Sequence, residues 1–156
     1  MLEIAIPGGR LFTLEYLVLD YNGTMACDGQ LLSGVGPRLV ALSSLLRIHV
    51  LTADTFGNAR RQLGALPCEV TVLPPQAQVE AKRAFVRHLG GERVVCIGNG
   101  RNDQLMLEEA ALGIAVIQAE GAAPAILQAA DVLCNDIRDA LDLLRQPRRL
   151  QATLRR

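Results

Sequence analysis

The sequence predicts an α/β fold, a Rossmann-like three-layer sandwich built around a mostly parallel central sheet. Along most of the 156 residues, apolar runs of strand length alternate with segments of helical periodicity. The runs are almost continuously apolar, which is typical of parallel strands that are buried on both faces. Half of the residues are hydrophobic but only 3% are aromatic, so we expect a core of Leu, Val, Ile and Ala.

Six strands are expected in the central sheet. The runs "EYLVLD", "IHVLT", "EVTVL", "RVVCIG", "GIAVI" and "DVLC" are short and rich in aliphatic residues. They occupy residues 15–20, 48–52, 69–73, 93–98, 113–117 and 131–134. The opening "LEIAIPGGRLF" predicts an edge strand and a turn ahead of the first central strand.

Helices are expected between these strands. Helical periodicity covers residues 35–47, 56–66, 76–90, 102–111 and 121–130, and a last helix covers 137–144 and resumes after Pro147. The sequence contains no internal repeat and no long linker. We therefore expect a single domain over 1–156, with a core over 14–135 and a C-terminal helix and basic tail over 136–156.

Composition argues against several classes of function. Sixteen basic residues balance sixteen acidic ones, so no overall charge attracts nucleic acid or a membrane surface. The absence of Trp argues against a base-stacking surface. The four cysteines lack C-x-x-C spacing, which disfavours a zinc site or a disulfide framework. No apolar run reaches membrane-spanning length and no signal segment is present, so a cytoplasmic location is expected.

The polar residues that end the apolar runs are the first candidates for a functional site. In open parallel sheets, ligands bind outside the carboxyl ends of the strands. The residues at those ends are Asp20, Thr52 and the loop "GNGRND", which contains Asn99, Asn102 and Asp103. The predicted topology therefore brings carboxylates and small polar groups to one edge of the sheet.

These residue types suit phosphoryl transfer. A carboxylate such as Asp20 can attack phosphorus and form an aspartyl-phosphate, which divides hydrolysis into two easier steps. Gly23 allows a turn in which backbone N–H groups approach phosphate oxygens. Thr52 and Lys82 could hold the other phosphoryl oxygens, and Mg²⁺ would bridge Asp20 and Asp103.

The ordered motifs resemble those of the haloacid dehalogenase (HAD)-like hydrolase superfamily. Its first motif, D-x-D-G-T, is similar to "DYNGT" at 20–24, and its second is similar to Thr52 in "HVLTAD". Lys82 in "VEAKRAF" matches the third motif. The segment "CIGNGRNDQLMLEEAALGIAVI" resembles the G-D-G-x-N-D region of P-type ATPases. The resemblance covers about residues 15–135 and is strongest to soluble P-type-ATPase-like members.

The resemblance implies a magnesium-dependent phosphohydrolase that acts on a small phosphorylated substrate or a phosphoprotein. The catalytic residues it implies are Asp20, Asn22, Thr52 and Lys82. The phosphate-binding residues are Gly23, Thr52, Ala53 and Lys82, and the metal ligands are Asp20, Asn22, Asn99 and Asp103. The intervals between motifs leave no room for a large cap, only a flap at 24–34. Capless members often cover the site with a neighbouring subunit, so a homo-oligomer is expected.

Two positions depart from the superfamily pattern. Asn22 stands where an Asp usually protonates the leaving group and activates water, and its amide can do neither, so slow turnover is expected. Its backbone carbonyl can still bind a metal. Asn99 stands where the fourth motif usually has its first Asp, which predicts weaker metal binding, with Asp28 or Asp54 as candidates to compensate.

Three hypotheses follow from these motifs. The first is the phosphohydrolase that uses Asp20 as its nucleophile. The second is a catalytically weakened HAD-like protein that binds phosphate or a partner in a regulatory role, as Asn22 and Asn99 suggest. The third is a Rossmann-type module that binds a nucleotide or metabolite, for which Asp20 and magnesium would be unimportant.

Overall fold

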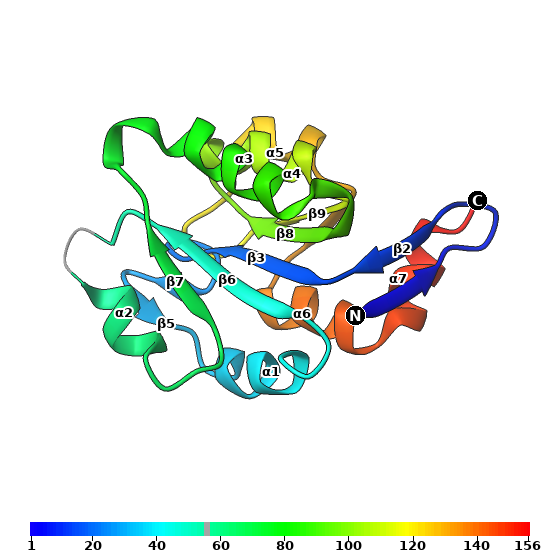
Figure 1. The fold of residues 1–156 in the computed structure, drawn as a ribbon, viewed down its shortest axis with the longest axis horizontal. Coiled ribbons are helices and arrows are strands. Elements are labelled where there is room, and N and C mark those ends of the chain that lie inside the picture. Colours follow the sequence, from blue (N-terminus) through cyan, green and yellow to red (C-terminus); the bar gives the residue numbers. More distant parts are fainter. Residues whose placement is uncertain (55–56) are drawn as a thin grey trace.

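A six-stranded sheet forms the centre of the computed structural model, which describes residues 1–54 and 57–156. The strand order is β10-β9-β8-β3-β6-β7, and every pairing in this sheet is parallel (Figure 1). The strands are β3 (Tyr16–Asp20), β6 (Arg47–Thr52), β7 (Glu69–Val72), β8 (Val94–Gly98), β9 (Leu112–Val116) and β10 (Val132–Cys134). The expected parallel α/β sheet is confirmed, and its six strands lie close to the expected positions.

Helices cover both faces of this sheet, which gives the three layers that the sequence predicts (Figure 1). One face is covered by α3 (Gln78–Leu89), α4 (Gln104–Glu109) and α5 (Pro124–Ala129). The other is covered by α1 (Val35–Leu42), α2 (Asn58–Leu63) and α6 (Ile137–Arg145). Along β3, Leu17 and Leu19 pack in the cluster under α1 and α6, whereas Val18 packs under α3. Both faces of β3 are therefore buried, which explains its unbroken apolar run.

The N-terminal segment differs from the prediction. Instead of an edge strand of the main sheet, residues 2–14 form an antiparallel hairpin of β1 (Leu2–Ala5) and β2 (Leu11–Leu14), and β2 leads directly into β3. The "IPGG" turn reverses the chain, with Gly8 at φ 71 and the Ile6 amide donating to the Arg10 carbonyl at 3.0 Å. The expected strand and turn are therefore present ahead of β3, but β1 pairs with β2 in a separate hairpin and not with the main sheet.

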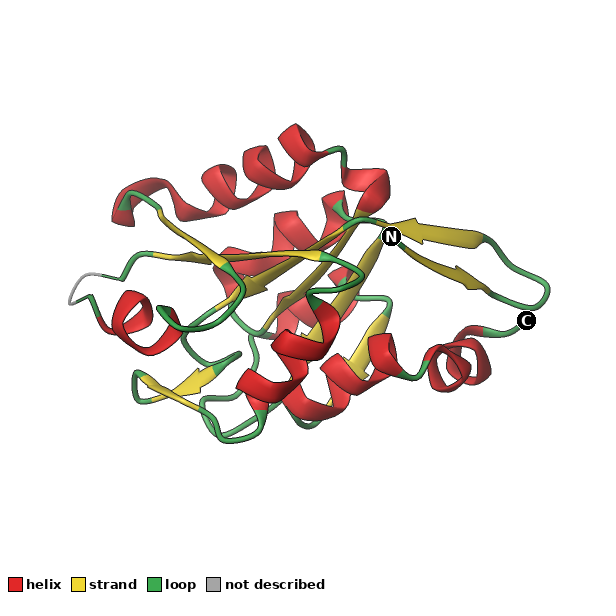
Figure 2. Cartoon of the chain, turned by 60° about the horizontal axis from the view of Figure 1, so that its bottom comes forward, coloured by secondary structure: helices red, strands yellow, loops and turns green. Residues whose placement is uncertain are grey.

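The C-terminal helix α7 (Pro147–Leu154) packs beside this hairpin, at the end of the molecule where the chain terminus lies (Figure 2). Gln151 donates its side-chain amide to the Ala5 carbonyl at 3.0 Å. The hydrophobic cluster on this side of the sheet takes in Ile4 and Phe12 from the hairpin and Leu150 from α7. Apolar packing therefore ties both ends of the chain to the main sheet.

Several helices are shorter than predicted. The helix expected over 35–47 ends at Leu42, where the Ser43 and Ser44 hydroxyls donate to nearby carbonyls in a turn. The helix expected over 56–66 is observed as Asn58–Leu63, and its predicted start at residue 56 lies outside the described residues. The flap is a hairpin of β4 (Ala26–Cys27) and β5 (Gln30–Leu31), and no large cap is found in the described part of the chain.

In the described ranges, none of the helices combines the length and the apolar character that crossing a membrane requires.

Candidate active site

The candidate site lies at the carboxyl ends of the central strands, because parallel pairing aligns those ends. Asp20, the last residue of β3, pairs with Leu51 of β6, so Thr52 ends its strand beside Asp20. On the other side, Leu19 pairs with Ile97 of β8, and the loop that contains Asn99 and Asp103 follows. The structure therefore brings together the three strand ends that the sequence singled out.

A buried ammonium joins the two carboxylates of the site. Lys82 projects from the second turn of α3, and its Nζ donates to Asp20 Oδ1 at 2.7 Å and to Asp103 Oδ1 at 2.6 Å. Lys82 and Asp103 are both 0% exposed, whereas Asp20 is 7% exposed. Asp20 is therefore the member of this triad that can be reached from the surface.

Burial governs the protonation of this triad. Burial, and after it the negative charge of Asp103, raises the pKa of Asp20 to about 7, although Lys82 acts in the opposite direction. Burial alone would lower the pKa of Lys82, but the two carboxylates more than offset this effect and raise it above its ordinary value. Lys82 is therefore charged, and one ammonium faces two acidic groups.

Thr24 holds the second oxygen of Asp20. Its hydroxyl lies 3.2 Å from Asp20 Oδ2 and 3.2 Å from Asn99 Oδ1, and it is fully buried. Gly23, at φ 78, lets the loop approach Asn99 closely, because a Cβ at this position would lie 2.3 Å from the Asn99 amide nitrogen. The N–H group of Gly23 donates to the Ala26 carbonyl at 2.9 Å, within the same loop.

The loop after β8 fixes the position of Asp103. Asp103 Oδ2 accepts hydrogen bonds from the backbone N–H groups of Asn99 at 3.0 Å and Gly100 at 2.9 Å. Asn99 in turn donates its side-chain amide to the Gly121 carbonyl at 3.0 Å. Asp103 directly precedes α4, in agreement with the helix start predicted there. Its other oxygen, Oδ1, accepts from Lys82.

The segment after β6 is shaped by local hydrogen bonds. The buried Thr52 hydroxyl oxygen accepts from the Asp54 amide at 3.1 Å, so its own hydrogen remains available to another acceptor. The Asp54 carboxylate accepts from the amides of Ala59 at 2.8 Å and Arg60 at 3.3 Å at the start of α2. Asp54 therefore serves the helix start, and the structure does not bring it into the Lys82 cluster.

Comparison with known proteins identifies two archaeal relatives and one ATPase. The chain is 48% identical to the uncharacterized protein MJ0073 of Methanocaldococcus jannaschii over 64 residues, which are 41% of this chain and 69% of that protein. The two therefore belong to one family. The chain is also 26% identical to the phospholipid-transporting ATPase NEO1 of Saccharomyces cerevisiae over 119 residues, 76% of this chain but only 9% of that protein. No family model matches the chain.

The solved structures that resemble this one include two 3-deoxy-D-manno-octulosonate 8-phosphate phosphatases. The enzyme from Moraxella catarrhalis, in complex with magnesium, phosphate and the sugar acid, has a TM-score of 0.71 at 17% identity and covers 85% of this chain and 86% of its own. The cobalt-bound enzyme from Haemophilus influenzae has a TM-score of 0.72 at 16% identity, with 91% and 93% covered. The chain has the fold of these phosphatases. At these identities, the solved structures establish the fold.

A pocket of about 340 Å³ opens beside the residues that follow β3 and β6. Its lining residues are Tyr21, Asn22, Asp28, Gly29, Ala53, Asp54 and Asn58. Asn22 and Ala53, both predicted from the motifs, thus lie on one cavity directly after the two strand ends. The flap closes one side, where the Gly29 carbonyl accepts hydrogen bonds from the Tyr21 hydroxyl at 3.0 Å and from Gln62 at 2.9 Å.

The donor atoms of the candidate site are compatible with a hard divalent cation. Oxygen atoms dominate the set, and such ligands suit magnesium. Asp20 and Asp103 accept from the same nitrogen, so one ion could contact both, and each retains an oxygen with an unused lone pair. One ammonium leaves the triad one positive charge short when both carboxylates are ionised. In the described ranges, no group of three or more His, Cys, Asp and Glu side chains is placed so that it could hold a metal ion, so Asn99 and the Asn22 carbonyl would complete the set.

Sequence reasoning overlooked one residue and left another open. Gln118 donates to the Thr24 carbonyl at 2.8 Å, so it contacts the loop after Asp20 directly. It follows the apolar run "GIAVI", and the strand-end rule that selected Asp20 and Thr52 would also have selected it. Thr24 could have been a simple turn residue, but its hydroxyl lies inside the site. Asp28 was a candidate to compensate for Asn99 in metal binding. It lies exposed in the flap, and this role stays a prediction.

Proposed function

We propose that this protein is a magnesium-dependent phosphohydrolase that acts on small phosphate monoesters through an aspartyl-phosphate on Asp20. One observation carries the proposal: the strand-end carboxylate of Asp20 is paired with a fully buried Lys82, and the residues that follow it, Tyr21 and Asn22, line an open pocket. The likeness of the fold to phosphatases supports a hydrolase of this type. The substrates of those enzymes are not carried over, because low identity supports the fold alone.

The reaction follows from the chemistry of these groups. An ionised Asp20 oxygen attacks phosphorus while the bond to the ester oxygen breaks, and the leaving oxygen takes a proton from water. Water then attacks the acyl phosphate, releases phosphate and restores the Asp20 carboxylate. Lys82 stabilises the ionised nucleophile, and the Thr52 hydroxyl donates to a phosphoryl oxygen. When held by Asp20, Asp103, Asn99 and the Asn22 carbonyl, magnesium would offset the repulsion between carboxylate and phosphate.

Asn22 sets the expected speed of this reaction. General acid–base assistance is worth about 10²–10⁴-fold in rate, and an amide cannot supply it. Asn22 is exposed on the pocket wall, where a carboxylate at the same position would face the leaving group. We therefore expect slow turnover and a phosphoenzyme that persists long enough to be trapped.

The pocket indicates which leaving groups are acceptable. Its described lining contains the carboxylates of Asp28 and Asp54 and no Lys or Arg. A second phosphate or a carboxylate on the leaving group would be repelled there, whereas a hydroxyl-rich or cationic group would be attracted. We propose monoesters of neutral or amine-bearing alcohols as the preferred class, with phosphoproteins disfavoured by the size of the pocket.

The direct test uses purified protein, an aryl phosphate and magnesium. We expect phosphate release that is lost with a chelator and lost in Asp20→Asn, while Asp142→Asn, a matched change in a distant ion pair, retains full activity. A panel of monoesters with anionic, neutral and cationic alcohols then tests the preference. An Asp20→Asn variant as active as the parent would overturn the assignment.

A catalytically weakened regulatory protein is the second candidate, because amides replace acids at Asn22 and Asn99. Asn22→Asp separates the two. A gain in turnover approaching 10²-fold or more would mark a site that lacks only its acid–base group. A loss of turnover would show that the amide has a role of its own, and an unchanged absence of turnover would favour a binding protein.

A further inference from the structure

Gln118 joins three parts of the molecule through one side-chain amide. It follows β9 and is half-buried. Its Nε2 donates to the carbonyl of Gly23 at 3.2 Å and to that of Thr24 at 2.8 Å. Its Oε1 accepts from the backbone N–H of Ile137, the first residue of α6, at 2.7 Å.

The partners determine which way this amide faces. The Ile137 N–H requires an acceptor, and the two loop carbonyls require donors. Rotating the amide by half a turn would place oxygen against both carbonyls and nitrogen against the N–H group. The orientation of Gln118 is therefore fixed by its surroundings, and it holds the loop against the rigid start of α6.

The loop that Gln118 holds is the one that orients the nucleophile. The Thr24 hydroxyl reaches Asp20 Oδ2 and Asn99 Oδ1, each at 3.2 Å. The N–H groups of Gly23, Thr24 and Met25 donate to the Tyr21 and Ala26 carbonyls inside the loop. The Gly23 and Thr24 carbonyls accept from Gln118 instead. A shift of the Thr24 backbone would therefore move the hydroxyl that fixes one oxygen of Asp20.

We propose that Gln118 is a positioning residue for the nucleophile: it fixes the loop at Gly23 and Thr24 and, through the Thr24 hydroxyl, the orientation of the Asp20 carboxylate. The inference rests on the proposed function, since it assigns a role in that same reaction. Among the described residues, the hydrogen bonds of the Gln118 side chain go to the Gly23 and Thr24 carbonyls and to the Ile137 N–H, and not to Asp20 or Lys82. Its effect is therefore on the rate of the chemical step rather than on substrate affinity.

Gln118→Glu is the informative variant. A glutamate keeps the acceptor for the Ile137 N–H but loses the donor and places a carboxylate against two carbonyls. Since small misplacements of reacting groups cost up to about 10²-fold in rate, we expect kcat to fall about 10- to 100-fold while KM changes little. Gln118→Leu removes both interactions and should lower kcat by a similar factor.

The control is Gln151→Glu, the same change at a side chain outside this network. Gln151 of α7 donates its side-chain amide to the Ala5 carbonyl at 3.0 Å, at the hairpin that precedes β3 and not at the loop that follows it. This variant should lower the unfolding temperature but leave kcat unchanged. If Gln118 had only a structural role, kcat would fall in proportion to the loss of unfolding temperature in Gln118→Glu, in Gln118→Leu and in the control alike.

A double-mutant cycle with Thr24→Ala tests the route. If Gln118 acts through the Thr24 hydroxyl, Gln118→Glu should change kcat by no more than about twofold in the Thr24→Ala background. An undiminished effect in that background, or a parent-like kcat in Gln118→Glu alone, would overturn the proposal.

Amide hydrogen exchange tests whether Gln118 holds the loop independently of whether the proposed phosphohydrolase activity exists. Gln118→Glu should accelerate exchange at residues 23–26, whereas Gln151→Glu should do so only near the N-terminal hairpin and α7. If the parent has no Asp20-dependent activity, the proposed function fails and catalytic positioning fails with it, while accelerated exchange still shows that Gln118 holds the loop. Active parent protein with unchanged exchange in Gln118→Glu refutes the inference alone.

Discussion

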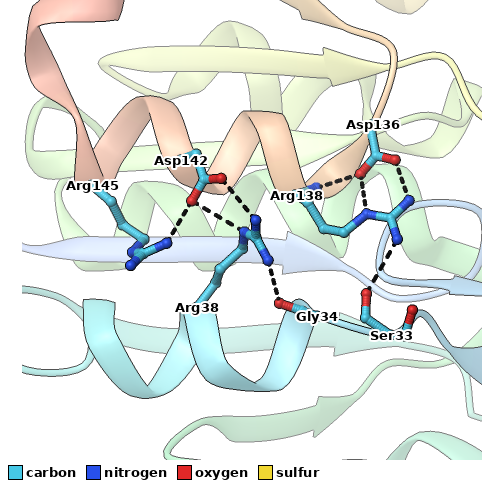
Figure 3. Close-up of polar contacts among 7 residues, drawn as sticks. All are labelled: Ser33, Gly34, Arg38, Asp136, Arg138, Asp142 and Arg145. Carbon is cyan, nitrogen blue, oxygen red and sulfur yellow. Dashed lines mark hydrogen bonds and ion pairs between the residues drawn. The ribbon is translucent and has the colours of Figure 1, made fainter.

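Two clusters of ion pairs in this protein use the same kinds of groups in opposite settings. In the site, Lys82 pairs with Asp20 and Asp103, and Lys82 and Asp103 have no exposed side-chain surface. Between α1 and α6, a surface cluster consists of two neighbouring groups (Figure 3). In one, Arg38 and Arg145 donate to Asp142, and Arg38 also donates to the Gly34 carbonyl. In the other, Arg138 donates to Asp136 and to the Ser33 carbonyl. There the side chains of Arg38 and Asp142 are 26% and 15% exposed.

The difference shows what each cluster is suited for. The surface cluster has three guanidinium groups for two carboxylates, and solvent screens the excess, so it links α1 to α6 at little cost. The site has two carboxylates for one ammonium, and burial leaves the imbalance unscreened. Such a buried, unbalanced cluster lowers the stability of the folded state rather than raising it. We infer that it serves the chemistry of the site.

The largest effect is expected from Lys82→Met. Removing the ammonium leaves two buried carboxylates facing each other, and breaking a buried pair in this way costs about 3–5 kcal/mol. Denaturant unfolding at neutral pH should show this loss, together with loss of phosphatase activity. A loss below about 1 kcal/mol, the value for an exposed pair, would mean that the buried cluster is no more costly than the surface one.

Asp20→Asn should have a much smaller effect on stability than Lys82→Met. The amide removes one of two like charges and leaves Lys82 and Asp103 as a balanced pair at 2.6 Å. We expect the free energy of unfolding to stay within about 1 kcal/mol of the parent or to rise, since functional groups often reduce stability. A loss as large as that of Lys82→Met would show that the Asp20 charge stabilises the fold.

His49 sharpens the comparison, because it is buried and has no hydrogen-bond partner at either ring nitrogen among the described residues. It lies on β6 and its ring makes an edge contact with Phe85, with centroids 5.3 Å apart. His49→Phe removes two unsatisfied polar atoms and should raise the free energy of unfolding by about 1 kcal/mol at pH 7.

The same variant has a pH signature. Burial lowers the pKa of His49 below 6.5, although Glu69 acts in the opposite direction. Below pH 6.5 the unfolded chain therefore binds a proton that the folded chain resists, and stability falls as pH falls. The advantage of His49→Phe over the parent should grow between pH 7 and pH 5, and a constant difference would contradict this account.

The strand-end rule explains how much of the site the sequence could predict. Asp20, Thr52, Lys82 and Asp103 were predicted because each lies in a motif whose position is fixed by a neighbouring strand or helix. The hairpin at 2–14 was not, because an apolar run of this length does not state which strand it pairs with. Partners distant in sequence, such as Thr24 and Asn99, are set by packing of the loops and carry no local pattern.

The smallest effect is expected at the surface cluster. Arg38 donates to both Asp142 oxygens, at 3.1 and 2.9 Å, but Arg145 also contacts Asp142, so Arg38→Gln leaves the carboxylate paired. We expect a loss of about 0.3–1 kcal/mol that shrinks in 1 M salt. Hydrogen bonds from Arg38 lower the pKa of Asp142 below 3.8, so the ion pair stabilises the protein above that pH and its contribution disappears as Asp142 is protonated in acid. The difference between Arg38→Gln and the parent should therefore vanish toward low pH, while the Lys82→Met deficit persists in high salt; a surface pair as salt-resistant as the buried one would remove the distinction between them.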